Sequence, residues 1–313
     1  MGSHSELMVK LAEKHNVIEE LIGNNDFHYV DYPLHGNVGD LLILQGTLEF
    51  FRKKKLSPSV IAPFSSYSPR WVSEGCVVVF HGGGNLGDLY RYPQFLREKV
   101  IQSRHGNRII ILPQTIYFQE EEAWERCRRI FSAHPDLHLF VRDERSFELG
   151  RELTPNVYLV PDMAHQLYPL AKSKSSNGEG VLAIQRLDDE RTGVALNAAT
   201  VTDWPLLVGS LRSRAIQSLV YLSYAFYLAG LGRIMLPVWH KTWFMMANKI
   251  TGEAVDLFER HEAVVSDRLH AHILACLLDM PNKVHDNSYG KNSSYIKSWT
   301  ISSPLVSLQA DRS

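Results

Sequence analysis

The sequence predicts an α/β fold of two domains, each built around a parallel sheet, and three observations support this prediction. Short β-branched apolar runs alternate with helix-patterned segments along most of the chain, as in doubly wound sheets. The 313 residues exceed what one core usually carries. A polar stretch rich in Gly and Ser interrupts the alternation. We therefore expect a domain at 1–171, a linker at 172–180 and a domain at 181–313, with a cleft between the domains.

Apolar periodicity predicts the elements in order along the chain, and continuous β-branched runs such as 76–80 indicate buried strands. The first half is expected to contain helix 10–22, strand 27–32, helix 40–51, strand 76–80, helix 92–104, strand 108–112, helix 120–132, strand 137–141, helix 146–153 and strand 157–160. The second half is expected to contain strand 181–184, helix 205–231, strand 233–238, helix 243–250, strand 262–265, helix 268–278 and a strand ending at 283–284.

Composition excludes several classes of protein. The formal net charge of -1 gives no general attraction to nucleic acid or acidic lipid. The three cysteines are far apart and form no C-x-x-C pair, which argues against a disulfide framework or a zinc site and favours a reducing compartment. No run approaches the ~18 apolar residues that span a bilayer, and the first residues do not form a secretory signal. We expect a soluble cytoplasmic protein without a transmembrane segment.

Polar residues follow nearly every predicted strand. The segments concerned are 35–40, 81–88, 113–115, 142–146, 161–165, 185–186, 239–241, 266–270 and 285–287. Ligands of open α/β sheets bind beyond the carboxyl ends of the strands. These segments are therefore expected to meet at one site.

Two similar glycine loops, 36–40 and 84–88, are each expected to precede a helix. Glycine lets a backbone approach a ligand closely, and helix N-termini attract anions. Asn37, Gly84 and Asn85 are thus candidate substrate contacts, whereas Asp40 and Asp88 can cap their helices or accept hydrogen bonds from sugar hydroxyls. Alternatively, the glycines only make tight turns. Neither loop matches a dinucleotide or P-loop fingerprint.

The segment 266–270 gives the sharpest signal. Ser266 or Asp267 is expected to cap a helix that begins there, and Arg268 in its first turn is suited to phosphate or carboxylate. His270 can exchange a proton with the bound group. Arg142, at another strand exit, is a second cation. The alternative is a surface arginine and a half-buried histidine.

Further candidates lie at other strand exits. His240 and Lys241 are additional candidate cations. Gln114, which follows the predicted strand 108–112, is a candidate polar contact to the substrate. Three tyrosines are candidates for stacking on sugar rings: Tyr90, Tyr92 and Tyr289.

These motifs together resemble those of the polysaccharide pyruvyl transferase family. The resemblance extends from about 34 to 295 and is carried, in the family's order, by 36–40, 81–88, 113–115, 142–146, 161–162 and 267–270. It implies a glycosyltransferase-B-like pair of Rossmann-like domains, with the acceptor on the first and the donor on the second. It also implies phosphoenolpyruvate as donor, a saccharide acceptor that is often lipid-linked, and a pyruvate ketal in exopolysaccharide or cell-wall glycan as product.

By the same resemblance, Arg142 and Arg268 match donor-binding arginines and His270 matches the catalytic histidine, with no organic cofactor or metal. The acceptor leaves open a peripheral position at the inner membrane face, and the sequence leaves a homo-oligomer open. We expect His270 to protonate the methylene carbon of the donor, while Asp40, Asp88 or Asp267 takes the hydroxyl proton. The competing hypotheses are a nucleotide-sugar-dependent glycosyltransferase of the same architecture and a non-catalytic glycan-binding protein.

Overall fold

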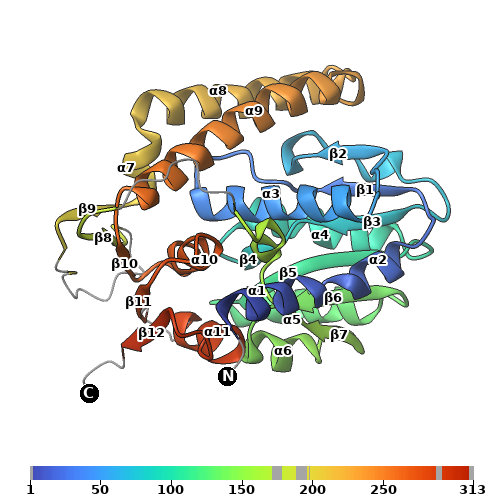
Figure 1. Cartoon of the computed structure of the whole chain (residues 1–313). Coiled ribbons are helices and arrows are strands. Elements are labelled where there is room, and N and C mark those ends of the chain that lie inside the picture. Colours follow the sequence, from blue (N-terminus) through green and yellow to red (C-terminus); the bar gives the residue numbers. More distant parts are fainter. Residues whose placement is uncertain (1–2, 171–177, 188–195, 197, 287–290, 310–313) are drawn as a thin grey trace.

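The computed structural model describes residues 3–170, 178–187, 196, 198–286 and 291–309. They form two parallel sheets with helices packed around them (Figure 1). The prediction of an α/β fold with parallel sheets is therefore confirmed. Residues 172–177 of the predicted linker at 172–180 lie outside the described residues. Tyr289 also lies outside them.

The first sheet has seven strands in the order β2-β1-β3-β5-β6-β7, with β4 paired to β5. Every strand pair in this sheet is parallel. Their bounds are β1 Phe27–Val30, β2 Val60–Ala62, β3 Val77–Phe80, β4 Gly83–Gly87, β5 Ile109–Tyr117, β6 Leu137–Val141 and β7 Asn156–Leu159. Strands β1, β3 and β6 are buried along their whole length, which explains their continuous apolar runs.

The second sheet has five parallel strands in the order β12-β11-β10-β8-β9. Their bounds are β8 Val181–Ile184, β9 Thr200–Thr202, β10 Ala263–Ser266, β11 Asn282–His285 and β12 Val306–Gln309. In both sheets the first strand lies between the second and the third. The strand order therefore reverses between β1 and β3 and again between β8 and β10, and ligands of such sheets bind at these switch points.

The helices cover the sheets and connect their strands (Figure 1). Their bounds are α1 His4–Glu13, α2 Asn16–Ile22, α3 Val38–Lys53, α4 Arg91–Ser103, α5 Glu121–Ser132, α6 Glu144–Gly150, α7 Trp204–Val208, α8 Ser210–Leu228, α9 Gly232–Glu259, α10 Leu269–Leu277 and α11 Lys291–Trp299. Three short 3-10 helices are η1 Phe64–Ser66, η2 Pro69–Trp71 and η3 Met163–Leu167. One apolar core contains residues of both sheets, such as Val79 and Leu182, and so joins them. Among the described helices, none combines the length and the apolar character needed to cross a bilayer.

Four predicted elements were wrong. Segment 205–231 is two helices, α7 and α8, which are separated at Gly209. Segment 10–22 is two helices, because α1 ends at Glu13 with Lys14 as its C-cap and α2 begins at Asn16. Segment 233–238 is the start of α9 and not a strand, since a short apolar run fits either structure and here Leu236 is buried on a helical period with Trp243. The second glycine loop forms strand β4 instead of leading directly into a helix.

Candidate active site

A cleft of about 640 Å³ opens at the carboxyl ends of strands from both sheets. Nine of the candidate residues named from the sequence line it: Asn37, Asp40, Gly84, Asn85, Tyr90, Tyr92, Arg142, Arg268 and His270. The strands that flank the two switch points supply Asp31, His81, Arg186 and Arg268, each located just beyond a strand end. The topology alone therefore places the cleft where a doubly wound sheet binds its ligand.

Arg142 and His270 share one carboxylate. Arg142 directly follows β6, and its guanidinium donates to Oδ2 of Asp162 through NH1 and to Thr115 Oγ1 through Nε at 3.0 Å. Nε2 of His270, in the first turn of α10, lies 3.3 Å from the same Oδ2. The buried arginine and the cleft histidine are thus oriented by one aspartate that joins the two sheets.

Asp162 is ionised in this position. Burial alone would raise its pKa, but His270, Arg142 and the backbone N–H of Ala164 outweigh burial and hold the pKa well below its usual range. The side chain is 1% exposed, so a full negative charge is kept in the protein interior. A buried anion of this kind fixes the direction in which its two partners point.

Arg268 is held by a second buried aspartate. Its Nε and NH2 donate to the two carboxylate oxygens of Asp203, with an NH2–Oδ2 distance of 2.6 Å. Arg268 itself is the N-cap of α10 and makes no side-chain cap, so the expected capping by Ser266 or Asp267 was wrong. Ser266 Oγ instead accepts from Arg268 N at 2.8 Å, and Asp267 Oδ1 accepts from the N–H of Arg186.

The ring of His270 packs directly on the first turn of α3. A Cβ added to Gly39 would lie 2.5 Å from Nδ1 of His270, a distance that real Cβ atoms do not reach. Asn37 caps this helix, because its Oδ1 accepts from Gly39 N at 3.0 Å. The first glycine loop therefore begins helix α3 and leaves space for the ring of His270.

The buried ion pair of Arg97 and Asp31 holds the second glycine loop in place. Arg97 donates to Asp31 Oδ2 at 2.8 Å and to Asn85 Oδ1 at 2.5 Å. Gln114 donates to the same Asn85 oxygen at 3.0 Å, so it positions the loop and does not line the cleft within the described residues. Burial raises the pKa of Asp31 to about 6, although Arg97 opposes this shift.

The predicted acidic residues occupy different places. Asp40 lines the cleft, with Oδ2 3.7 Å from Nε2 of His35. The carboxylate of Asp88 instead accepts from the backbone N–H groups of Gln119 and Glu120 at 2.7–3.0 Å. Asp88 lies outside the set of described residues that line the cleft.

His240 and Lys241 also lie outside that lining, on α9. The ring of His240 stacks on Phe244 and meets Tyr32 edge-on, and burial lowers its pKa to about 4. Lys241 is exposed. The prediction that these two residues join the strand-exit site rested on a strand at 233–238 that the structure replaces with helix.

His81 is a buried polar group in the wall of the cleft. Its Nδ1 lies 2.6 Å from the hydroxyl of Tyr29, while its Nε2 has no hydrogen-bond partner among the described residues. Burial lowers its pKa to about 3, so the ring is neutral at working pH. A neutral imidazole at this place can offer a ligand one hydrogen bond without adding charge.

Comparison with known proteins identifies the family. The family model described as polysaccharide pyruvyl transferase matches residues 37–282, which includes the cleft segments 81–85 and 267–270. The chain belongs to the polysaccharide pyruvyl transferase family. It is therefore a transferase, and membership supports transfer of a pyruvyl group to a polysaccharide.

Two relatives support the assignment to the pyruvyl transferases. EpsO of Bacillus subtilis, which bears the name of a pyruvyl transferase, is 34% identical over 96% of this chain and 94% of its own. Pyruvyl transferase 1 of Schizosaccharomyces pombe is 28% identical over 86% of this chain and 68% of its own. The crystal structure of an uncharacterized protein of Klebsiella pneumoniae has the same fold, with a TM-score of 0.62 at 22% identity over 97% of this chain and 98% of the other.

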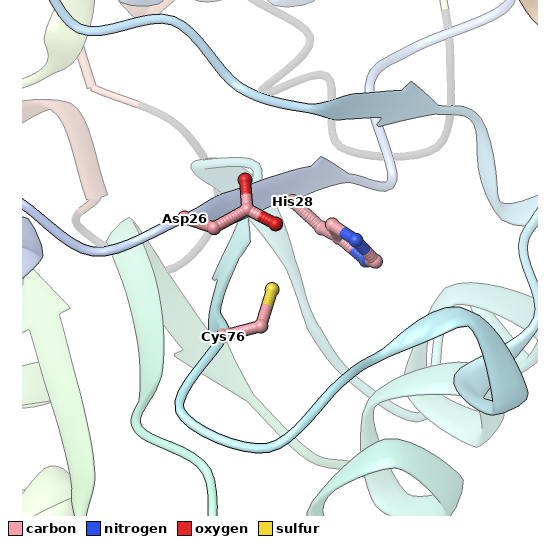
Figure 2. A group of neighbouring side chains, drawn as sticks. All are labelled: Asp26, His28 and Cys76. Atoms are coloured by element: carbon pink, nitrogen blue, oxygen red, sulfur yellow. The ribbon is translucent and has the colours of Figure 1, made fainter.

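One group of side chains in the described part of this pyruvyl transferase has the spacing of metal ligands. The ligand atoms of Asp26, His28 and Cys76 all lie within 4.8 Å of one another (Figure 2). The group sits at the amino ends of β1 and β3, opposite the cleft. His28 Nδ1 already bonds the Tyr67 hydroxyl at 3.0 Å, and burial raises the pKa of Cys76 to about 11. A cation there would first have to displace the thiol proton, and it would not touch the cleft.

Three residues that hold the cleft side chains of this pyruvyl transferase in place had no role predicted from the sequence: Asp162, Asp203 and Arg97. Asp162 was recognised in a family motif but received no role. Asp203 stands before Trp204 and Pro205, and an acidic N-cap followed by proline is a helix-start signal that could have drawn attention to it. Arg97 lies within a helical pattern and gives no local signal, because its partners come from other segments.

Proposed function

We propose that this cleft transfers the pyruvyl group of phosphoenolpyruvate to a saccharide and forms a pyruvate ketal in exopolysaccharide or cell-wall glycan biosynthesis. The observation that carries the proposal is that Arg142, Arg268 and His270 line one cleft although they come from two sheets. Phosphoenolpyruvate needs two cations to bind its phosphate and carboxylate, and an acid to protonate its methylene carbon. The family membership of the chain supports the same reaction.

The arginines bind the donor. Phosphoenolpyruvate carries a phosphate and a carboxylate, and planar guanidinium groups bind such anions with paired hydrogen bonds that lysine cannot give. Asp162 and Asp203 hold the two guanidiniums in place before the donor arrives. Each guanidinium has five N–H donors, so a carboxylate on one side still permits an anion on another. The first amides of α10 add a positive helix end.

His270 supplies the proton. The proton of the imidazolium forms a new C–H bond at the methylene carbon, and positive charge develops at the carbon that bears the phosphate. A sugar hydroxyl forms a C–O bond there and gives up its proton. The C–O bond to phosphate then breaks, phosphate leaves with the bonding electrons, and a second hydroxyl closes the ketal and gives up its proton. Asp162 stabilises the charged ring before the transfer.

Asp40 is the proposed base for the sugar hydroxyl. Of the three acidic residues considered from the sequence, it alone lines the cleft in the described structure, whereas Asp88 and Asp267 accept backbone hydrogen bonds. No organic cofactor enters this chemistry. We place the reaction in the cytoplasm, where phosphoenolpyruvate is made.

The architecture fits a glycosyltransferase-B-like pair of Rossmann-like domains, 1–171 on the acceptor side and 181–313 on the donor side. The matching strand orders of the two sheets support this division. His81, Asp40 and the second glycine loop come from the first unit, and Arg268 and His270 from the second. Asp162 of the first unit accepts from Arg142 of the same unit and contacts His270 across the division.

Thermal unfolding tests whether phosphoenolpyruvate is the donor that binds. The protein is heated with phosphoenolpyruvate, UDP, UDP-sugars or phosphate, since a ligand at 100 times its Kd stabilises by about 2.7 kcal/mol. We expect phosphoenolpyruvate to raise the unfolding temperature and Arg268→Ala to abolish the rise. A rise with UDP and none with phosphoenolpyruvate would replace this proposal with the nucleotide-sugar glycosyltransferase.

A further inference from the structure

The connection between β9 and β10 is a long helical hairpin. Helices α8 and α9 are joined by residues 229–231 and run side by side along the upper side of Figure 1, from the second sheet to above β2. The later part of α9 is anchored in the core by Trp243, Ala247 and Ile250. The hairpin is therefore rooted in the fold while its outer face is exposed.

Large apolar side chains are exposed on both helices. The strongest cases, 59–79% exposed, are Leu211, Tyr221, Leu228, Ile234, Val238 and Met245. On α9, Ile234, Val238, Lys241 and Met245 follow one another at spacings of four, three and four, which places them on one face. Surface apolar residues usually occur singly, whereas several of them gathered on one face mark an interaction site. We call Ile234, Val238 and Met245 the apolar stripe, within which Lys241 adds a cation.

The charge of the hairpin is one-sided. From Trp204 to Gly252 the sequence has five Lys or Arg and no Asp or Glu, a formal charge of +5 in a chain whose net charge is -1. Arg212 pairs with Glu253, but Arg214, Arg233, Lys241 and Lys249 are exposed. An apolar stripe flanked by cations is complementary to a bilayer that contains anionic lipid. Lysine and a single sign of charge are unfavourable in an interface between two copies of one chain.

The hairpin adjoins the rim of the cleft. Ser223 of α8 bonds Ser65 of η1 at 3.0 Å, and the neighbouring Phe64 lines the cleft. Phe64 stacks on Tyr92, which also lines the cleft and is 77% exposed. A surface that covers the hairpin would thus lie close to the cleft mouth.

We propose that the α8–α9 hairpin lies on the surface of a bilayer containing anionic lipid and holds the cleft mouth near it. The helices lie in the interface plane and do not cross the membrane. The inference rests on the proposed function in one respect. The proposed function supplies a saccharide acceptor, and the inference adds that this saccharide is carried on a membrane lipid.

Vesicle sedimentation tests the hairpin directly and requires no turnover. The full chain is mixed with vesicles of phosphatidylcholine alone or with added phosphatidylglycerol. We expect binding to vesicles with phosphatidylglycerol, weaker binding at higher salt and little binding to phosphatidylcholine alone. The triple variant Ile234→Ser, Val238→Ser, Met245→Ser and the double variant Arg214→Glu, Lys249→Glu should each weaken partitioning by about tenfold or more.

Matched substitutions on α1 serve as controls. Val9 and Lys10 are both exposed there, so Val9→Ser and Lys10→Glu should leave vesicle binding unchanged. Each hairpin variant should retain the thermal shift with phosphoenolpyruvate, which shows that it folds. Absence of that shift in the unaltered protein would count against the proposed function and not against the membrane inference.

Two outcomes would overturn the membrane inference. One is equal binding, or no binding, of the unaltered protein to the two kinds of vesicle. The other is unchanged vesicle binding by both hairpin variants. If vesicle binding is absent and the protein is a dimer that the hairpin variants dissociate, the apolar stripe is covered by a second copy of the chain.

Discussion

Nε2 of His270 lies 3.3 Å from Oδ2 of Asp162, although 108 positions separate the two residues in the sequence. The contact joins the first turn of α10 in the second sheet to the segment after β7 in the first. The same oxygen accepts from Arg142. One buried carboxylate therefore positions both His270, the proposed proton donor, and Arg142, a proposed cation for binding phosphoenolpyruvate.

His270→Gln should separate binding from chemistry. The amide keeps a polar contact but cannot protonate carbon, so we expect turnover to fall at least ~100-fold. Binding of phosphoenolpyruvate should change little, because Arg142 and Arg268 remain. Steady-state phosphate release and calorimetric titration measure the two quantities. Retained turnover would remove His270 from the proposed role.

Asp162→Asn should affect both activity and stability. Removal of the charge leaves Arg142 without its buried anion, which we expect to cost roughly 3 kcal/mol of unfolding free energy, and turnover should fall about 100-fold. The matched control is Asp136→Asn, because Asp136 is 39% exposed where it pairs with Arg108 and His138, and its loss should cost less than about 1 kcal/mol. Urea titration and phosphate release check both variants. Equal behaviour of the two variants would refute a special role for Asp162.

Gly39→Ala should displace the ring of His270. The added Cβ would overlap Nδ1, and a shift of the catalytic group by about 1 Å can reduce the rate ~100-fold. Gly252→Ala in α9 is the control, since a Cβ there meets nothing within 4 Å and the helix should gain up to about 1 kcal/mol. The values of kcat/KM for both variants measure the effect. Normal activity of Gly39→Ala would mean that His270 need not hold its observed position.

His15 should make stability depend on pH in the acid range. Its Nε2 donates to Pro161 O and its Nδ1 accepts from Gln166, each at 2.9 Å, so the buried ring is neutral. Burial lowers its pKa to about 4 from 6.5 in the unfolded chain. Below pH 6.5 the unfolded chain therefore binds a proton that the native site does not, and stability falls until about pH 4.

Replacing His15 measures this contribution. In His15→Gln the slope of unfolding free energy against pH between 6.5 and 4 should decrease by about 1.4 kcal/mol per pH unit. Urea titrations at several pH values give the slope. An unchanged slope would show that His15 takes up its proton in the folded protein.

Sequence reasoning found the strands that are buried on both faces. β3 and β6 consist of continuous apolar residues and were predicted nearly residue for residue. The start of α9 was mistaken for a strand because it carries apolar residues on its exposed face as well as its buried one. That exposed face is the stripe for which we infer a lipid partner.

The site was predictable where a residue directly follows a strand. Arg142, Arg268 and His270 were placed correctly in one cleft because parallel strands end at the same edge of their sheet. Asp203 and Asp162 were not assigned, since their importance arises from partners in distant segments. Asp88 repeats the local pattern of Asp40, yet β4 carries it to a different surface.

The central claim is that phosphoenolpyruvate is the donor of a pyruvate ketal. The most direct test incubates the protein with phosphoenolpyruvate and a panel of saccharides, free and lipid-linked, and follows phosphate release together with the mass of the saccharide. We expect phosphate release that depends on an acceptor, a product that gains a pyruvate ketal, and no product with His270→Gln. A saccharide that gains a sugar from a UDP-sugar, with phosphoenolpyruvate left intact, would contradict the account.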